Sequence, residues 1–413
     1  MADPLNLSRR MTLSNIVQAI TTYGPVSRAS VAKMTGYSKQ TVSEVVSSLE
    51  DDGWVQTVGR TEGNVGRRAV VYEIVPNAAL VASVDLGGTK VRVALCNLSG
   101  AVVEELAEPT CQDGGEAVVD QIARIVGLAA RAHGIAQEKV RVVVVGVPGA
   151  PDAETGSIQM APNIAGIDEI DFPTLLNQRL GIEVLVENDV NLAALGEHWM
   201  THQGETDDLV YLSIGTGIGA GVVIGGQLVR GARGAAGEVG FIPFGADPTE
   251  PESRQIGALE RMAATSAIVN GYLAETGVQK TVPEIFEAHL AGEAAASRVL
   301  QTTAAYIARA IGTIAAVIDP KCIVIGGSIG ARPELIQMIE REIARSFPRD
   351  IPIETSVLGN HAALAGGLRL PCLGFTSRCS QAGSRMQTSS SRRRKSAPFA
   401  RVWHELRPLP TAA

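Results

Sequence analysis

A glycine-rich turn after a run of apolar residues is the first stretch of this sequence able to support chemistry. The run Leu80-Val-Ala-Ser-Val84 predicts a buried strand that ends in Asp85. The turn itself comprises Gly87, Gly88, Thr89 and Lys90, and a second apolar run follows at 91–95. Glycines let the backbone approach a ligand closely, and exposed N–H groups can hold phosphate oxygens. Because the spacing is not that of a Walker A loop, an ordinary tight hairpin remains the alternative.

Other predicted strands also end in glycines or acidic residues. The strands at 140–147, 182–186, 209–214 and 322–325 lead into Gly146-Val-Pro-Gly149, Glu187-Asn-Asp189, Gly215-Thr-Gly217 and Gly326-Gly-Ser-Ile-Gly330. Helical patterns alternate with these strands, which favours an α/β fold. Open α/β sheets place ligands beyond their strand ends, so these segments are candidates for one shared site.

At this point the sequence resembles the ROK family. The resemblance rests on four motifs in order: Asp85-Leu-Gly-Gly-Thr-Lys90, Glu187-Asn-Asp189, Gly215-Thr-Gly-Ile-Gly219 and Gly234-Ala-Ala-Gly-Glu-Val-Gly240. It spans roughly residues 9–370. That family groups sugar-responsive repressors with glucokinase-like and N-acetylmannosamine kinases. The resemblance implies a two-lobed, actin-like ATPase (sugar kinase-type) α/β fold, preceded in the repressor branch by a winged helix-turn-helix.

The resemblance also implies roles for individual residues. Asp189 would be the catalytic base if the chain is a kinase, because a carboxylate can accept a hydroxyl proton during phosphoryl transfer. The implied sugar-binding residues are Asn163, Asn188, Asp189, Glu238 and Glu260. The implied phosphate- or nucleotide-binding residues are Asp85, Gly87, Gly88, Thr89, Lys90, Gly215, Thr216 and Gly217. From the residues alone, Glu187-Asn-Asp189 also fits a helix N-cap with acidic groups against the dipole.

Two departures from the family pattern concern metal and sugar binding. Phe241 stands where relatives have a histidine that binds both sugar and a structural zinc. The family's cysteine-rich zinc loop is replaced by residues 244–258, which contain no cysteine. Without thiolate or imidazole ligands we expect no structural zinc, and we assign no metal-binding residue. The sugar pocket beside Phe241 is expected to be reshaped, with the ring stacked on an apolar sugar face.

The first seventy residues predict a DNA-binding module. Apolar spacing indicates helices at 13–23, 28–35 and 39–51, with Ser27 and Ser38 as N-caps and a Gly36-Tyr37 turn between the second and third. Val31 and Met34 are expected to face inward. Helix, glycine-containing turn and helix form the helix-turn-helix pattern. The expected DNA-contacting residues are Ser38, Lys39, Gln40, Thr41 and Ser43 on the third helix, with Arg67 and Arg68 in a wing.

That wing is the loop between two predicted strands, Trp54–Val58 and Ala69–Ile74. Its arginines suit phosphate contacts. The alternative is a three-helix packing or dimerisation module whose charges are merely solvated. Residues 1–70 hold 8 Lys and Arg against 6 Asp and Glu, a modest excess, so DNA affinity is expected to require a dimer on two half-sites.

Length and charge divide the 413 residues into three parts. We expect a DNA-binding domain at 1–76, an effector-binding domain at 77–372 and a basic, disordered tail at 373–413. Residues 375–413 hold 8 Lys and Arg against 1 acidic residue, whereas the net charge of −7 places a large acidic excess on the body. The tail is either a basic arm that adds non-specific DNA affinity or a non-native extension from a frameshift. Scattered cysteines and the lack of a long apolar run predict a cytoplasmic protein without membrane contact.

These features favour a sugar-responsive transcriptional repressor over two alternatives. The expected partners are a double-stranded DNA operator, a sugar or sugar phosphate, and further copies in a homodimer or homotetramer. No cofactor is required for this function. The alternatives are an ATP-dependent sugar kinase, which would use ATP with Mg²⁺, and a chain with both activities. Fold resemblance alone does not decide among them.

Overall fold

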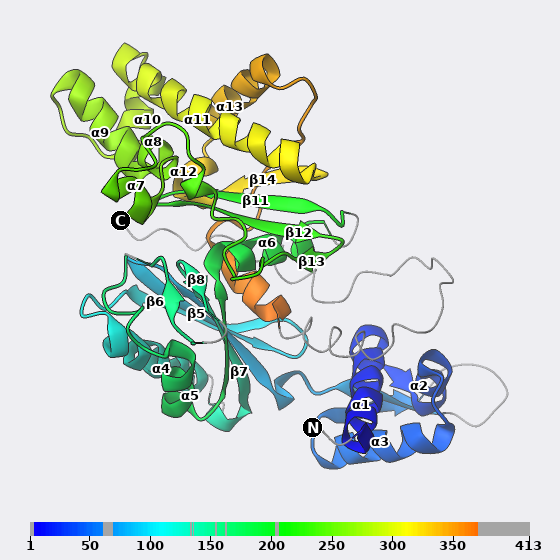
Figure 1. The fold of residues 1–413 in the computed structure, drawn as a ribbon. Helices are drawn as coiled ribbons and strands as arrows, with labels where there is room; N and C mark the ends of the chain where they lie inside the picture. Colours follow the sequence, from blue (N-terminus) through cyan, green and yellow to red (C-terminus); the bar gives the residue numbers. More distant parts are fainter. Residues whose placement is uncertain are drawn as a thin grey trace.

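The computed structural model describes residues 4–60, 69–132, 134, 136–152, 155–161, 163–202 and 206–370. The expected tail at 373–413 and the proposed wing residues Arg67 and Arg68 lie outside the described residues. Figure 1 shows an N-terminal module, drawn in blue, beside a larger body built on two sheets.

Three helices and a small sheet form the N-terminal module. They are α1 (Pro4–Tyr23), α2 (Arg28–Thr35), α3 (Lys39–Asp51), β1 (Val26–Ser27), β2 (Val55–Arg60) and β3 (Val70–Ile74), with sheet order β1-β3-β2. Side-chain oxygens of Ser27 and Ser38 accept the N–H groups of Ser30 and Thr41, which fixes where α2 and α3 begin. Gly36 ends α2 in the left-handed conformation, with φ of 77°. Both helices have the bounds that the sequence predicts.

Three expectations for this module are wrong in detail. The first helix begins at Pro4 rather than at residue 13. The sequence did not reveal this start, because residues 4–12 lack the apolar spacing of the later turns. Proline is tolerated in a first helical turn. Met34 is 42% exposed, since Val31 and Ala32 already fill the inner face of α2. The first strand of the hairpin also extends to Arg60.

The first sheet of the body has the strand order β10-β7-β4-β5-β6. Its strands are β4 (Leu80–Leu86), β5 (Lys90–Asn97), β6 (Val102–Pro109), β7 (Val140–Val147) and β10 (Glu183–Asn188). Strands β4, β7 and β10 are parallel, and β4, β5 and β6 form an antiparallel meander. The strand predicted at 182–186 is β10, which runs to Asn188 rather than ending at Val186. The expected hairpin around Gly87-Gly88 is confirmed.

The second sheet repeats this topology in the order β13-β12-β11-β14-β15. Its strands are β11 (Leu209–Ile214), β12 (Ile218–Ile224), β13 (Gln227–Leu228), β14 (Cys322–Gly326) and β15 (Ile353–Thr355). Each sheet starts with a glycine-turn hairpin and adds two parallel strands on the other side. The turns at Gly87-Gly88 and Gly215–Gly217 therefore occupy equivalent positions in the two sheets.

Helices cover the outer faces of both sheets (Figure 1). Helices α4 (Gly115–Ala132) and α5 (Phe172–Leu180) pack on the first sheet. The second sheet is covered by α8 (Glu260–Ala263), α9 (Thr265–Thr276), α10 (Val282–Leu290), α11 (Ala294–Ile318) and α13 (Pro333–Ser346). Short elements complete the chain: α7 (Pro251–Ile256), α12 (Gly327–Gly330), β8 (Ala150–Pro151), β9 (Ile158–Gln159), η1 (Pro76–Ala78), η2 (Gln137–Lys139), η3 (Val239–Phe241) and η4 (Gly359–His361). Within the described residues, none of the helices combines the length and apolar character of a membrane span.

Two helices lie between the sheets, α6 (Asp189–Met200) and the helix at 362–370. Glycines allow them to pack closely. A Cβ at Gly196 would lie 2.1 Å from the carbonyl oxygen of Ala362, and a Cβ at Gly366 would lie 1.8 Å from that of Leu192. Since protein interiors are close-packed, this contact fixes α6, and with it Asp189 at the first turn.

Candidate effector site and DNA-contacting helix

The N-terminus of α6 is built by Asn188. Its Oδ1 accepts the N–H of Asn191 at 2.9 Å, and its Nδ2 donates to the carbonyl oxygen of Gly149 at 2.9 Å. The capping alternative therefore describes Asn188 correctly. Because both its oxygen and its nitrogen make hydrogen bonds within the protein, Asn188 positions the start of α6, and its proposed sugar contact would have to share these atoms. Asp189 follows it in the first helical turn.

Four carboxylates from different elements influence one another at this point: Asp85, Asp189, Glu238 and Glu260. Burial, with repulsion from Asp85 and then Glu238, raises the pKa of Asp189 from its ordinary 3.8 to about 7. Burial and repulsion from Glu238 raise the pKa of Glu260 to about 7. Burial also raises the pKa of Glu238. Such a cluster offers several carboxylate oxygens as acceptors for hydroxyl donors.

Arg92 forms an ion pair with one member of this cluster, Asp85, and the sequence reasoning missed it. Its guanidinium lies 3.0 Å from Oδ2 of Asp85. Burial nevertheless raises the pKa of Asp85, against the lowering effect of Arg92. Asp85 and Arg92 are directly paired across the β4–β5 hairpin. Counting outward from the Gly87-Gly88 turn would therefore have found the pair.

A second ion pair holds the start of α6 in place. Nε of Arg230 lies 2.6 Å from Oε2 of Glu187, whose Oε1 accepts Nδ2 of Asn191 at 3.0 Å. Glu187 is only 5% exposed. It therefore acts as a structural anchor beside Asp189. Arg230 was not identified from the sequence, because no spacing rule links it to Glu187.

The two glycine turns each bring one further expected residue into place. A Cβ at Gly88 would lie 2.9 Å from the Cβ of Asn163, and a Cβ at Gly217 would lie 3.0 Å from Oε2 of Glu260. The same Oε2 accepts the N–H of Ile218 at 2.8 Å. Side chains larger than hydrogen at these two glycines would collide with Asn163 and Glu260.

Some donors in these turns are already used. The N–H of Gly87 donates to the carbonyl oxygen of Lys90 at 3.0 Å, and that of Gly215 donates to Gly217 at 2.9 Å. Thr89, Lys90 and Thr216 are exposed at the turn tips. A phosphate group would therefore meet these tips rather than the N–H groups of Gly87 and Gly215. Ser328 at the start of α12 also approaches the second turn, since a Cβ at Gly215 would lie 3.1 Å from its Oγ.

On α3, the candidate DNA-contacting residues differ in their engagement. Ser38, Lys39 and Gln40 are exposed. Ser38 caps the helix and shares a hydrogen bond with the hydroxyl of Thr41 at 2.8 Å. Ser43 accepts a hydrogen bond from Arg28 at 2.9 Å, so its hydroxyl orients α2 against α3. Nε2 of Gln40 donates to Oε1 of Glu44 at 3.0 Å along the same exposed face, so a base contact by Gln40 would replace that bond. Lys39 is exposed beside it and is well placed to reach a phosphate.

Comparison with known proteins places these features in a family. The sequence profile described as the ROK family matches residues 81–371. The chain belongs to the ROK family. A putative xylose repressor of Caldicellulosiruptor sp. is 29% identical over 85% of this chain and 92% of its own length. A glucokinase of Halalkalibacterium halodurans is 30% identical over 69% of this chain and 92% of its own.

A solved structure supports the same fold. A ROK family transcriptional regulator, described as a homolog of the Escherichia coli MLC protein, superposes with a TM-score of 0.74. The match covers 91% of this chain and 98% of that one, at 22% identity. The expected actin-like fold is therefore confirmed. The similarity to the putative xylose repressor covers 85% of the chain, which is more than the body and the tail together, so it extends into the N-terminal module. The similarity to the glucokinase covers only 69%.

The loop at 244–258, for which the family resemblance implied a zinc site in relatives, is held together here without zinc ligands. Phe241 is half-buried in η3, and its N–H donates to the carbonyl oxygen of Glu238 at 3.2 Å. Residues 244–258 offer neither imidazole nor thiol. Arg261 holds this loop instead, through ion pairs with Glu250 and Glu252 and a 2.6 Å hydrogen bond to Ser253. This donor set does not fit zinc.

The raised pKa of Asp189 predicts how stability depends on pH. The folded state keeps the Asp189 proton to higher pH than the unfolded state, so the free energy of unfolding falls between about pH 4 and 7. We expect Asp189→Asn to reduce this fall. Three pKa units at about 1.4 kcal/mol each set an upper limit of about 4 kcal/mol for the stability gained at pH 8.

Urea unfolding at pH 4, 6 and 8 measures this difference. Asp168→Asn is the matched control, because Asp168 is exposed. Equal slopes for the parent and Asp189→Asn would contradict a raised pKa of Asp189 in the folded protein.

Proposed function

We propose that this ROK protein is a sugar-responsive transcriptional repressor whose N-terminal module binds an operator. The observation that carries the proposal is the connection between module and body. β3 ends at Ile74, β4 begins at Leu80, and β4 carries Asp85 near its far end. A five-residue linker that contains the η1 turn therefore joins the DNA-binding module to the strand that carries Asp85.

The short linker is bonded to the body. The carbonyl oxygen of Pro76 accepts the N–H of Leu98 at 2.9 Å. The side chains of Asn77 and Asn97 share a 3.0 Å hydrogen bond, and Nζ of Lys139 donates to the Asn77 carbonyl at 3.2 Å. A change in the first sheet would therefore move the module rather than be absorbed by a slack connection.

A sugar suits the carboxylate site because its hydroxyl groups donate hydrogen bonds. Asp189, Glu238 and Glu260 are half-buried acceptors, and bound hydroxyls would offset the cost of their partial burial. Asn163 would add an amide beside the Gly88 turn. The similar proteins described as a putative xylose repressor and a glucokinase support a sugar as the ligand. The sugar weakens operator binding if it prefers an arrangement of the sheets that the DNA complex excludes; typical coupling is about 1–3 kcal/mol.

The proposed DNA complex contains two modules. The N-terminal region has only a small basic excess and the body is acidic, so one module gives little electrostatic affinity. A homodimer or homotetramer bound to two half-sites supplies the rest. We assign residues 1–76 to DNA binding and 77–372 to effector binding.

The exposed residues of α3 predict two different effects on DNA binding. Gln40→Ala should weaken binding to the preferred operator by about 5- to 150-fold, corresponding to one lost base contact of about 1–3 kcal/mol. Lys39→Ala should weaken all sequences alike and reduce the salt dependence by about one phosphate contact per module.

Sequence selection from random duplexes by the intact protein identifies the operator, and fluorescence anisotropy at several salt concentrations measures affinity. Arg345→Ala, which removes an exposed charge on α13, is the control. The helix-turn-helix assignment fails if both α3 variants match this control.

An ATP-dependent sugar kinase is the second candidate, and the state of Asp189 favours it. A carboxylate with a pKa of about 7 is suited to act as a general base near neutral pH. The exposed tips Thr89, Lys90 and Thr216 would face the phosphates of ATP with its Mg²⁺. Kinases among the similar proteins support the possibility.

Phosphorylation of a sugar panel separates the two functions. With ATP and Mg²⁺, and with xylose, glucose and N-acetylglucosamine as substrates, we expect no turnover above that of Asp189→Asn. Sugar binding, measured by calorimetry, should instead weaken at least about tenfold in that variant through loss of a charged hydrogen-bond acceptor. Turnover in the parent that Asp189→Asn abolishes would make the chain a kinase.

A further inference from the structure

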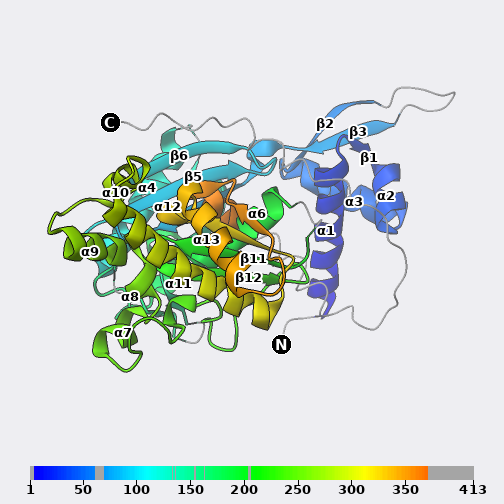
Figure 2. The ribbon, with the colours of Figure 1, turned by 90° about the horizontal axis from the view of Figure 1, so that it is seen from above.

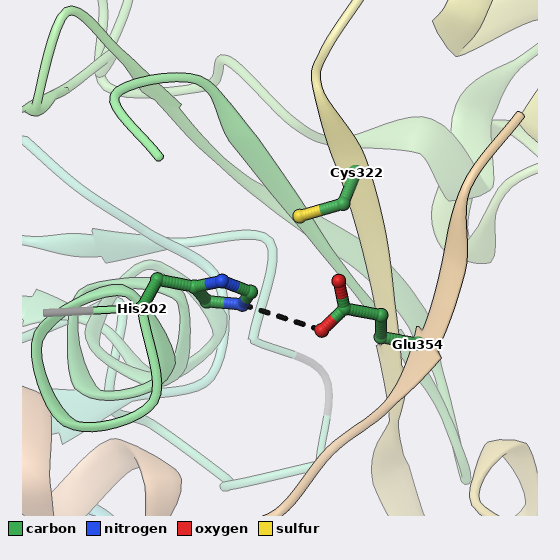
Figure 3. A group of neighbouring side chains, drawn as sticks. All are labelled: His202, Cys322 and Glu354. Carbon is green, nitrogen blue, oxygen red and sulfur yellow. Dashed lines mark ion pairs between the residues drawn. The ribbon is translucent and has the colours of Figure 1, made fainter. Parts of the chain in front are cut away.

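A cluster of three potential metal ligands lies at the other end of α6 from the carboxylate site. Figure 3 shows His202, Cys322 and Glu354 converging from three elements. His202 follows α6, Cys322 is the first residue of β14, and Glu354 is in β15. Asp189 is at the start of α6, a helix of 12 residues that spans about 18 Å. The cluster is therefore separate from the proposed effector site.

Strand register explains why Cys322 and Glu354 share a face of the second sheet. Glu354 is paired with Val324 in the parallel β14–β15 ladder. Cys322 precedes Val324 by two positions, so its side chain points to the same side. Cys322 and Val324 both belong to the apolar cluster that packs against α6. His202 reaches this face from the end of that helix.

The separations fit a small ion. The three ligand atoms lie within 4.8 Å of one another, and Nε2 of His202 is 3.6 Å from Oε2 of Glu354. Tetrahedral zinc with metal–nitrogen and metal–sulfur distances of about 2.0 and 2.3 Å places its ligands about 3.3–3.5 Å apart. A small side-chain rotation would close the remaining difference.

His202 supplies an independent sign that a partner is missing. Its Nε2 is buried and has no hydrogen-bond partner among the described residues, because the 3.6 Å contact with Glu354 is too long for a hydrogen bond. Buried polar atoms are normally satisfied. The unsatisfied nitrogen points toward the space between Cys322 and Glu354, where an ion would sit (Figure 3).

We propose that His202, Cys322 and Glu354 bind a divalent transition-metal ion, with Zn²⁺ the best match. Thiolate and imidazole donors favour Zn²⁺ over Mg²⁺ or Ca²⁺, which prefer oxygen ligands. Three protein ligands leave the fourth position to water. Binding converts the Cys322 thiol to a thiolate and releases its proton to solvent.

The ion would connect edge strand β15 to β14 and to the end of α6. Glu354 is about half exposed, which gives the ion a route from solvent. The proposal departs from the expectation that the chain has no metal-binding residue. That expectation considered only local cysteine and histidine spacing, whereas these three ligands are far apart in sequence.

Cobalt binding to the full-length protein tests the site, because Co²⁺ takes the same ligands as Zn²⁺ and its bond to a thiolate gives a charge-transfer absorption band. The parent for the test carries Cys372→Ser and Cys379→Ser, which removes the thiols outside the described residues. We expect about one equivalent of Co²⁺ with a thiolate band, and displacement by Zn²⁺. Cys322→Ser should abolish the band, and His202→Gln should weaken Zn²⁺ binding by at least about tenfold.

Cys111→Ser is the matched control, because Cys111 is a free, half-buried cysteine elsewhere in the fold. It should leave the band unchanged. Circular dichroism checks folding, and if Cys322→Ser does not fold, His202→Gln decides the question, since His202 lies beyond the helix end. A parent without a thiolate band, or Zn²⁺ affinity equal in the parent and His202→Gln, would overturn the proposal.

Discussion

Burial of acidic groups where the two sheets meet is the constraint on which the proposed function depends. Asp189 is fixed at the first turn of α6 by the Asn188 cap and the Glu187–Arg230 ion pair. Burial and nearby carboxylates raise its pKa to about 7, while Arg92 neutralises Asp85 only in part. A folded protein keeps such a costly arrangement where a ligand can satisfy it. Hydroxyl donors of a sugar would do so, and their binding energy would then depend on how the two sheets are placed.

In the proposed function, strand β4 connects the carboxylate site to the N-terminal module that binds DNA. It carries Asp85 near one end, and its other end joins the N-terminal module through a short linker bonded to the body. Figure 2 shows the module at one end of the body, outside the region between the two sheets. The proposed ligand site and the proposed DNA-binding module are therefore separate in space but connected by β4 and the short linker before it. Such a separation is what the proposed repressor needs, because a ligand in the body would then act on DNA binding from a distance.

Local patterns in the sequence were sufficient for much of the fold. Serine caps and a glycine turn correctly defined α2 and α3, and alternating apolar runs defined the β4–β5 hairpin and β7, because these signals act between near neighbours. The interactions that complete the site were missed where they depend on tertiary packing. Arg230 approaches Glu187, and His202 approaches Cys322, only after the sheets and α6 have assembled. Met34 was misplaced because helical periodicity does not show which inward positions neighbouring side chains already fill.

The central claim is that sugar binding controls DNA affinity through the direct connection between β3 and β4. Insertion of two glycines between Ala78 and Ala79 tests it, with operator affinity measured with and without the inducing sugar. The same insertion after Gly292, in an exposed turn between α10 and α11, is the control. The account predicts that operator and sugar each bind the linker variant within about threefold of the parent, and that the sugar no longer changes DNA affinity. An undiminished sugar effect in the linker variant would contradict the account.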